Sequence, residues 1–360
     1  MLIKWLHNSG APKMFLWVAK NLALKGHNIT ILTYMNTDKP LIVPSHINYI
    51  HKNLQNTGIL KRINIIRNII KEEQPDISIS FLLDANIYNI FACYGLNTKS
   101  IICERNDPFK PRYFKLKLLK PFFKFADGAV FQLEKVKEYY SIIKKETAVI
   151  PNPVLASQNI NINSFNYRDN EIVTLSRLDL KQKRLDILIY AFKKFQKLFP
   201  QYILKIYGEG PDKEKIQELI TRLDLQDKVI LAGVSVNPQK NIYNAKMFIL
   251  TSDFEGIPNA LIEAMALGLP CISTDCSPGG AALLIQNNVN GLIVPRGNIN
   301  MIYAKMKYIA SNPNIADQLG TNAKLIKCRF SEEKIANMWN EYLNHIYITY
   351  NGSKQISSII

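Results

Sequence analysis

A strand, a glycine turn and a helix follow one another in the segment Met247-Phe-Ile-Leu-Thr-Ser-Asp-Phe-Glu-Gly-Ile-Pro-Asn-Ala-Leu-Ile-Glu-Ala-Met-Ala-Leu267. The first residues form a short apolar run that favours a buried strand, and Pro258 suits the first turn of the helix that follows. Gly256 allows another group to approach the backbone closely. A helix starting there presents free backbone N–H groups and a partial positive charge, which suit an anion or a hydroxyl-rich ligand.

The same rhythm of strand and helix continues on both sides of this segment. We expect further strands at residues 2–7, 29–34, 77–81, 99–103, 129–132, 148–150, 172–175, 203–207, 229–232, 271–274 and 292–294. Such alternation predicts α/β domains with parallel sheets that are covered on both faces. Pro151-Asn-Pro153 and a polar stretch after it interrupt the rhythm. We therefore expect two Rossmann-like, doubly wound domains, at 1–165 and 166–330, facing each other across a cleft. A C-terminal helix at 331–360 is expected to pack back toward the first domain.

The charge of the chain points to an anionic partner. The 360 residues include 45 Lys and Arg against 29 Asp and Glu, a net charge of +16. Residues 1–165 hold 22 of the basic and 11 of the acidic residues, a net of +11. Such a field favours a phosphorylated substrate, nucleic acid or an anionic membrane surface. The five cysteines are odd in number and lack C-x-x-C spacing, so we do not expect a disulfide framework. Cysteines that stay free indicate a reducing compartment, and we therefore expect the protein in the cytoplasm.

Charged side chains in the second half fall where strands end. Glu255 and Glu263 are separated by a little over two helical turns, so both carboxylates can reach one side of the predicted site. Arg177 and Lys183 follow the strand at 172–175, and such cations suit phosphate oxygens. Read alone, Glu255 is equally well a helix cap and Glu263 a solvated residue, and the two cations fit a solvated basic loop.

Glycine turns follow other strands, at Gly208-Glu-Gly210, Ser277-Pro-Gly-Gly280 and Asn8-Ser-Gly10. Each turn on its own is more often structural than functional. Their order together with the two carboxylates and the two cations is more specific. In this respect the chain resembles family 4 of the retaining glycosyltransferases, which have the GT-B fold. Glu255-x7-Glu263 carries the resemblance most strongly, and Asn290-Gly-Leu-Ile-Val-Pro295 agrees with it.

The resemblance implies a role for each matching residue. Arg177 and Lys183 would neutralise the diphosphate of a UDP-sugar donor, Glu263 would bind the ribose and Glu255 the donor sugar. The remaining donor-site residues would be Gly10 near the phosphates, Gly208 and Gly233 near the base, and Gly256, Ile257, Pro258 and Asn259 beside the sugar. Many members carry a histidine in a first-domain loop where this chain has Glu104, Arg105 and Asn106. Which of these three faces the sugar stays open.

The resemblance also implies a reaction. A hexose or N-acetylhexosamine would move from UDP to a glycan acceptor held by the first domain, with its anomeric configuration retained. No D-x-D motif occurs, so we expect neither a metal nor another cofactor, and the cations and the helix terminus would stabilise the departing UDP.

A basic aromatic stretch at residues 108–125 suggests where the acceptor comes from. It has six aromatic and six basic residues and no acidic one, and the basic residues are Lys110, Arg112, Lys115, Lys117, Lys120 and Lys124. Such a segment suits anionic lipid headgroups, although an ordinary amphipathic helix with a solvated lysine face fits as well. We expect peripheral attachment to the inner face of the cell membrane and a lipid-diphosphate-linked acceptor, as in bacterial capsule, O-antigen or glycoprotein assembly.

Three rival classes remain open. A basic nucleic-acid-binding protein fits the charge, but no zinc-finger, RRM, KH or helix-turn-helix signature occurs, so we expect no nucleic-acid partner. A different GT-B-like enzyme, such as a sugar-nucleotide epimerase or a phosphorylase, would share the fold. An inactive scaffold would explain the altered first loop, Ser9-Gly-Ala-Pro-Lys13, and the missing histidine.

Overall fold

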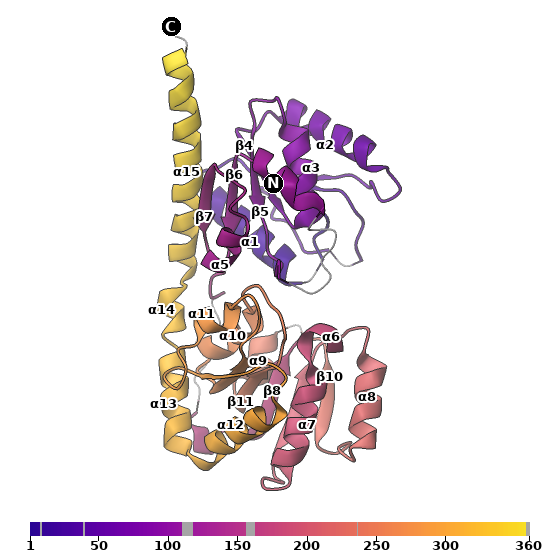
Figure 1. Cartoon of the computed structure of the whole chain (residues 1–360), viewed down its shortest axis with the longest axis vertical. Coiled ribbons are helices and arrows are strands. Elements are labelled where there is room, and N and C mark those ends of the chain that lie inside the picture. The colour runs from indigo at the N-terminus through magenta and orange to yellow at the C-terminus, as the bar shows by residue number, and fades with distance from the viewer. Residues whose placement is uncertain (8, 39, 110–117, 156–162, 236, 358–360) are drawn as a thin grey trace. The chain divides into compact units, whose positions relative to one another are not determined.

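The chain folds into two compact α/β units. The structure, a computed structural model, describes residues 1–357 except 8, 39, 110–117, 156–162 and 236, with side chains described as far as residue 350 (Figure 1). Unit 1 comprises Met1–Asn152 and Glu333–Ile360, and unit 2 comprises Pro153–Glu332. The sequence places the boundary at residue 165, whereas the units divide between Asn152 and Pro153.

Unit 1 is built on a seven-stranded sheet in the order β3-β2-β1-β4-β5-β6-β7, with every pair of neighbours parallel. Its strands are β1 (Leu2–Ile3), β2 (Thr30–Thr33), β3 (Asn48–His51), β4 (Ile77–Phe81), β5 (Lys99–Cys103), β6 (Gly128–Phe131) and β7 (Glu146–Val149). Its helices are α1 (Gly10–Leu24), α2 (Ile59–Glu73), α3 (Leu83–Cys93), α5 (Glu134–Tyr139), the 3-10 helix η1 (Lys120–Phe125) and α15 (Glu332–Ser357). The alternation found in the sequence thus produces the expected parallel sheet.

The long helix α15 completes the core of unit 1 (Figure 1). Trp339 is fully buried and stacks on Phe81 of β4, with ring centroids 6.2 Å apart. The hydroxyl of Tyr342 donates to the carbonyl of Glu146 in β7 at 3.0 Å. These contacts join the last part of the chain to strands from its first half.

Unit 2 is built on a six-stranded parallel sheet in the order β10-β9-β8-β11-β12-β13. Its strands are β8 (Asp169–Leu175), β9 (Ile203–Tyr207), β10 (Val229–Gly233), β11 (Ala245–Leu250), β12 (Cys271–Thr274) and β13 (Leu292–Val294). Its helices are η2 (Phe165–Tyr167), α6 (Leu180–Lys183), α7 (Leu185–Gln196), α8 (Lys213–Arg222), α9 (Pro238–Ile242), α10 (Asn259–Ala266), α11 (Gly280–Leu284), α12 (Ile299–Ser311), α13 (Pro313–Ala323) and α14 (Ile326–Arg329). All six strands expected in this half are present.

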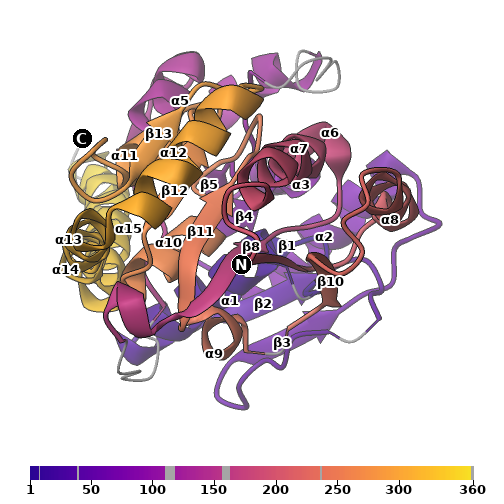
Figure 2. The same cartoon turned by 90° about the horizontal axis from the view of Figure 1, so that it is seen from below.

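Each sheet has one point at which the chain order reverses. In unit 2 this point lies between β8 and β11, which are neighbours in the sheet although two strands separate them in the sequence (Figure 2). In open α/β sheets such a switch point, at the carboxyl ends of the strands, is where ligands bind. In unit 1 the corresponding point lies between β1 and β4.

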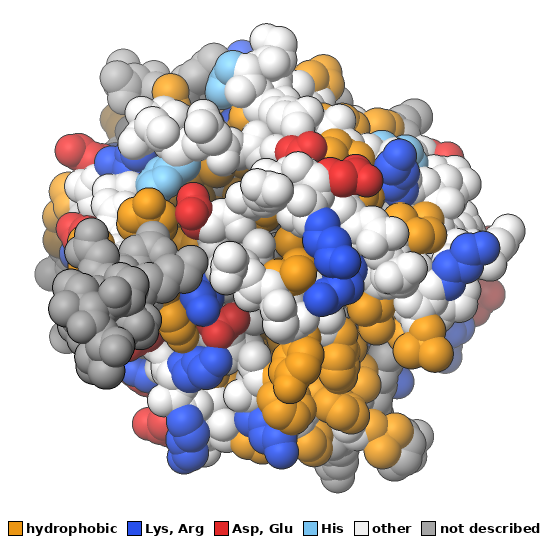
Figure 3. Space-filling model, turned by 90° about the horizontal axis from the view of Figure 1, so that it is seen from above, with side chains coloured by type: hydrophobic (Ala, Val, Ile, Leu, Met, Phe, Trp, Pro, Cys, Tyr) orange, Lys and Arg blue, Asp and Glu red, His pale blue; other side chains and the backbone are white. Residues whose placement is uncertain are grey.

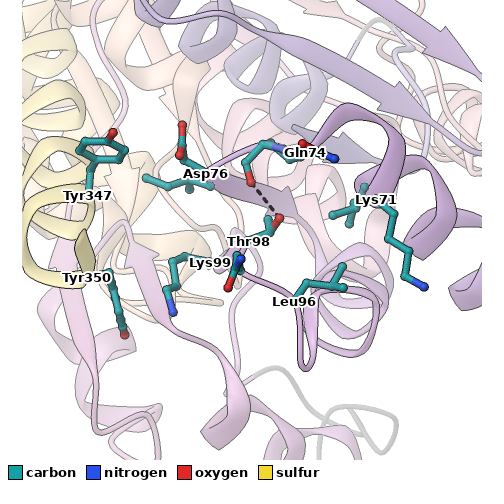
Figure 4. Close-up of a pocket in the computed structure, with 12 residues that line it drawn as sticks. Lys71, Gln74, Asp76, Leu96, Thr98, Lys99, Tyr347 and Tyr350 are labelled. Carbon is teal, nitrogen blue, oxygen red and sulfur yellow. Dashed lines mark hydrogen bonds between the residues drawn. The ribbon is translucent and has the colours of Figure 1, made fainter. Parts of the chain in front are cut away.

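A pocket of about 470 Å³ lies in unit 1 at the amino ends of the strands, where β4 and β5 begin (Figure 4). Thr98 Oγ1 donates to the carbonyl of Pro75 at 2.8 Å in its wall. Lys71, Asp76 and Lys99 also line it. Because ligands of such sheets bind at the carboxyl ends of the strands, this pocket is not the candidate site.

Candidate functional site

The switch point of unit 2 brings Lys183 and Glu255 together. Lys183 ends α6, in the loop that follows β8, and Glu255 follows β11. The Lys183 ammonium forms an ion pair with Oε1 of Glu255, and the two side chains are 16% and 12% exposed. A cation and a carboxylate so nearly buried hold each other in place, because each would be costly to leave unpaired. The two residues that the sequence singled out from separate motifs therefore form one unit.

The loops that carry this pair are joined along their length. Gln182 Nε2 donates to the carbonyl of Phe254 at 3.0 Å, and the amide of Asp253 donates to the carbonyl of Gln182 at 2.9 Å. Arg184 adds an ion pair to Asp253 at 3.1 Å and a second one to Asp186 at 3.2 Å. These bonds fix the position of Lys183 relative to Glu255 without help from a ligand.

Ser252 also holds the carboxylate of Glu255. Its side chain is fully buried, and Oγ donates to Oε1 of Glu255 at 2.7 Å. Thr274 Oγ1 in turn donates to the carbonyl of Ser252 at 2.6 Å, which ties this turn to the end of β12. Nothing in the residue spacing marked Ser252 as part of the site, and Arg184 stood out only as one cation of the basic loop after β8.

Close backbone packing explains the glycines beside Glu255. A Cβ at Gly280 would lie 1.8 Å from the carbonyl oxygen of Gly256, so only glycine fits there. The amide of Glu255 donates to the carbonyl of Ser277 at 2.8 Å, and the amide of Ser277 donates to the carbonyl of Asp253 at 3.0 Å. The turn at 277–280 therefore supports the segment that leads into α10.

The glycines after β9 and β10 have a similar structural task. A Cβ at Gly208 would lie 1.9 Å from the carbonyl oxygen of Ser176, and one at Gly210 would lie 2.4 Å from that of Leu178. The amide of Gly208 donates to the carbonyl of Gly233 at 2.8 Å. These turns thus bring the ends of β9 and β10 against the loop that carries Arg177, whose own side chain is exposed.

Helix α10 begins at Asn259, with Pro258 as its N-cap residue. The start of this helix, at Gly256, Ile257, Pro258 and Asn259, brings the positive end of the helix dipole to the carboxyl end of the sheet. Glu263 lies one turn further along α10 and is half-buried. In the parts of the chain that the structure describes, no three His, Cys, Asp or Glu side chains gather to hold a metal ion.

The loop after β5 in unit 1 separates the three candidates Glu104, Arg105 and Asn106. Arg105 points inward, since its guanidinium lies 4.5 Å from the ring of Phe81 and donates to Oδ1 of Asn152 at 3.2 Å. Asn106 is exposed. Arg105 is thus half-buried against Phe81, and Asn106 is the most exposed of the three residues.

Glu104 is buried, and its two carboxylate oxygens differ. Oε1 accepts from the amides of Arg105 and Asn106, both at 3.0 Å, and from the side chain of Asn106 at 3.1 Å. Oε2 is buried without a hydrogen-bond partner. Burial raises the pKa of Glu104 to about 7, although the hydrogen bonds from the loop oppose this shift.

The remaining candidates of unit 1 lie apart. Gly10 is exposed and begins α1. Lys120 and Lys124 lie on η1, and their ammonium groups sit 3.8 Å from the ring of Tyr139 and 5.0 Å from that of Phe125. The other predicted membrane-facing residues, Lys110, Arg112, Lys115 and Lys117, fall outside the described residues.

Comparisons with known proteins agree with this arrangement. Residues 157–326 match the family described as glycosyl transferases group 1. An uncharacterized glycosyltransferase of Methanocaldococcus jannaschii is 34% identical over 63% of this chain and 62% of its own length. A Campylobacter jejuni enzyme, named as an α-1,4-N-acetyl-D-galactosaminyltransferase acting on a diphospho-undecaprenol-linked glycan, is 26% identical over 94% of this chain and 95% of its own.

Solved structures share the fold. The crystal structure of Anabaena HepE in complex with UDP superposes with a TM-score of 0.79 over 96% of this chain and 98% of that one, at 18% identity. The two parallel-sheet units thus have the GT-B arrangement of strands expected from the sequence. Together with the relatives named as glycosyltransferases, the match of residues 157–326 shows that this part of the chain, most of unit 2, resembles the glycosyl transferases group 1 family.

Proposed function

We propose that this protein is a retaining, metal-independent glycosyltransferase that moves a hexose or an N-acetylhexosamine from a UDP-sugar to a lipid-diphosphate-linked glycan. The observation that carries the proposal is the Lys183–Glu255 pair at the switch point of unit 2, beside the N-terminus of α10. An open α/β sheet binds its ligand at this place. The name of the Campylobacter relative supplies the class of acceptor, and the UDP in the HepE crystal supplies the nucleotide.

The proposed reaction uses the charges at the switch point. In it, Lys183, the exposed Arg177 and the start of α10 would lie beside the diphosphate, which becomes more negative as it departs, and such fixed positive groups lower the barrier. The bond between the anomeric carbon and the diphosphate breaks, and UDP takes the electron pair. An acceptor oxygen forms the new glycosidic bond on the same face, and its proton passes to the departing phosphate. Glu255 holds the sugar and offsets the positive charge that develops on it.

The experiment compares the two residues of the pair with a residue outside it. Glu255→Ala and Lys183→Gln should each lower UDP-sugar transfer at least about tenfold, whereas Glu214→Gln, which removes an exposed carboxylate from α8, should leave it unchanged. UDP binding measured by calorimetry should weaken in Lys183→Gln. Full transfer with normal donor affinity in Glu255→Ala would contradict this placement of the sugar.

The proposed absence of a metal has its own test. Transfer should continue in the presence of EDTA, because the cations and the helix terminus take the place of a divalent ion at the diphosphate. If the chelator stopped turnover and magnesium restored it, the metal-independent mechanism would be wrong. Release of free UDP only when an acceptor is present distinguishes a transferase from an epimerase, and a failure to bind UDP would favour a scaffold.

The site of action is proposed to be the cytoplasmic face of the cell membrane. The lipid-linked acceptor and the basic first half of the chain support this placement. Among the described residues, none of the helices is both long and apolar enough to cross a bilayer. Attachment would therefore have to use a surface of the protein, which fractionation of cells into membrane and supernatant at low and high salt would detect.

A further inference from the structure

Exposed apolar side chains gather where the end of α3 meets η1 in unit 1. Tyr94 is 68% exposed and Phe125 is 43% exposed, and their ring centroids lie 6.4 Å apart. Leu118 and Phe122 are exposed beside them, and Phe122 also packs on the half-buried Phe91 at 5.4 Å. We call Tyr94, Leu118, Phe122 and Phe125 the aromatic ridge. In the space-filling view onto this end of the molecule, hydrophobic side chains gather in one area with lysine and arginine side chains nearby (Figure 3).

Buried packing and hydrogen bonds fix the backbone that carries the ridge. Phe123, between its two phenylalanines, is fully buried and stacks on Tyr140 at 5.4 Å. Arg67 of α2 donates to the carbonyls of Ala92 and Tyr94 at 2.9 and 2.6 Å, which fixes the end of α3. The exposed rings are therefore presented by a fixed backbone, and leaving them in water costs free energy that a partner would recover.

Two lysines flank these rings. The ammonium of Lys124 lies 5.0 Å from the ring of Phe125, and that of Lys120 lies 3.8 Å from the ring of Tyr139. Their aliphatic stems can cover apolar surface while their charges stay in contact with water. Neither the end of α3 at 89–97 nor the segment 118–125 contains an Asp or Glu. The surface thus combines bulky apolar groups with positive charge, and neither of these two segments adds a carboxylate.

This combination favours a membrane over a protein partner. Protein interfaces are enriched in aromatic residues and arginine but depleted in lysine, whereas Lys120 and Lys124 on η1 are both lysines. At a lipid surface, aromatic rings settle at the level of the headgroups and lysines pair with anionic phosphates. The net charge of +11 over residues 1–165 adds long-range attraction to the same partner.

We propose that the aromatic ridge, with Lys120 and Lys124, is the surface by which unit 1 docks on an anionic phospholipid membrane. Tyr94 and Phe125 enter the headgroup layer, and the two lysines contact lipid phosphates. This docking would serve the proposed transfer to a lipid-linked acceptor, and in that respect the inference rests on the proposed function. The docking itself needs no sugar donor, so it can be measured separately.

Vesicle binding by the full chain tests the ridge. The probes are vesicles of phosphatidylcholine mixed with phosphatidylglycerol, vesicles of phosphatidylcholine alone, and inorganic phosphate as a competitor. The protein should sediment with the anionic vesicles at low salt, bind the neutral ones far less, and remain bound when phosphate is added at the same ionic strength. Lys120→Gln with Lys124→Gln should weaken binding about fivefold for each lysine. Tyr94→Ser with Phe125→Ser should weaken it at least about tenfold.

Matched variants in unit 2 provide the controls. Lys307→Gln with Lys327→Gln removes the same charge from exposed positions, and Tyr167→Ser with Tyr308→Ser removes two exposed aromatic rings. Both control pairs should bind vesicles within about twofold of the unaltered chain. Circular dichroism and UDP binding, which reports on unit 2, should be unchanged in all four.

Two results would overturn the proposal: no binding of the unaltered chain to anionic vesicles, or equal losses in the ridge variants and their controls. Release of the protein by inorganic phosphate at constant ionic strength would also count against it, since it would show an anion site without lipid docking. If the unaltered chain bound anionic vesicles but not UDP, the proposed transferase function would be rejected while the proposed docking surface would still be supported.

Discussion

Oγ of Ser252 donates a hydrogen bond of 2.7 Å to Oε1 of Glu255, the same oxygen that pairs with Lys183. A carboxylate held by a hydroxyl and an ammonium has little freedom to turn. The proposed sugar-binding group is therefore in position before any donor arrives, and this saves the free energy of ordering it during the reaction.

Replacement of Ser252 by alanine tests that positioning. A hydrogen bond to a charged group contributes roughly 1.5–3 kcal/mol, so Ser252→Ala should lower the free energy of unfolding by about that amount and kcat for transfer several-fold. The control is Ser273→Ala, which removes a buried hydroxyl whose bond goes to the neutral carbonyl of Thr274. Transfer kinetics and urea unfolding distinguish the two. Equal losses of activity in both variants would show that Ser252 acts only through stability.

A double-mutant cycle measures the coupling between Lys183 and Glu255. Each single change, Lys183→Met or Glu255→Gln, leaves a nearly buried group without its partner and should destabilise the protein by about 3 kcal/mol. The double variant should be more stable than the sum predicts by about 1–3 kcal/mol. The same cycle on the exposed pair Lys213 and Glu209 should give less than about 1 kcal/mol. Additive losses at the first pair would mean that the two side chains do not interact in solution.

The pKa of Glu104 makes stability depend on pH. Because burial raises this pKa to about 7, the folded protein holds a proton that the unfolded chain has lost between about pH 4.5 and 7. Stability should therefore fall as the pH rises through this window. Glu104→Gln, which keeps an acceptor for the loop amides, should be more stable than the unaltered chain near pH 8 by up to about 3 kcal/mol and nearly equal to it near pH 4. Urea unfolding across this range checks the sign, and parallel curves for the two proteins would refute the assignment.

Arg105 and Asn106 should respond differently to substitution. Arg105→Lys loses the flat contact with Phe81 and part of the bonding to Asn152, so it should lower the free energy of unfolding by about 1–3 kcal/mol. Asn106→Ala removes the hydrogen bond from this side chain to Glu104, so it should lower the free energy of unfolding by about 0.5–1.5 kcal/mol and raise KM for the acceptor. Unfolding curves and acceptor titrations separate these effects. A stable Arg105→Lys protein with poor acceptor use would reverse the assignment.

Gly280 should not tolerate a side chain. The Cβ of Gly280→Ala would fall 1.8 Å from the carbonyl oxygen of Gly256, and backbone on both sides leaves no flexible group to yield. We expect a loss of more than about 3 kcal/mol and weaker UDP binding, since the segment leading into α10 must move. Gly58→Ala serves as the control, because its Cβ would meet nothing within 4 Å and its φ is −62°. Normal stability of Gly280→Ala would show that the two turns are further apart than described.

The sheets of both units could largely be predicted from the sequence. The strands at Ile77–Phe81, Lys99–Cys103 and Ile203–Tyr207 match the expected ranges residue for residue, because apolar residues predominate in buried parallel strands. The strand expected at residues 2–7 contains only Leu2–Ile3, since the carbonyl of Lys4 accepts bonds from Tyr34 and Met35 beyond the end of β2. β3 was missed, because three of its four residues are exposed and no apolar run marks it.

The site was predictable only in part. The sequence marks Lys183 and Glu255 as members of separate loops, and their pairing depends on the reversal of strand order between β8 and β11. The contributions of Ser252 and Arg184 depend on side-chain direction, which residue spacing does not encode. The inward turn of Arg105 likewise depends on Trp339, which comes from a helix more than two hundred positions later.

The packing of Trp339 against Phe81 has a consequence for the order of events during synthesis on the ribosome. Unit 2 is continuous in the chain, so all its strands have been translated before α15 emerges. Translation of unit 1 begins before that of unit 2 and ends after it, because α15 supplies a buried part of the core of unit 1. Until then the nascent polypeptide exposes the apolar surface of unit 1 on which that helix packs. A chaperone that binds exposed apolar surfaces would therefore bind unit 1.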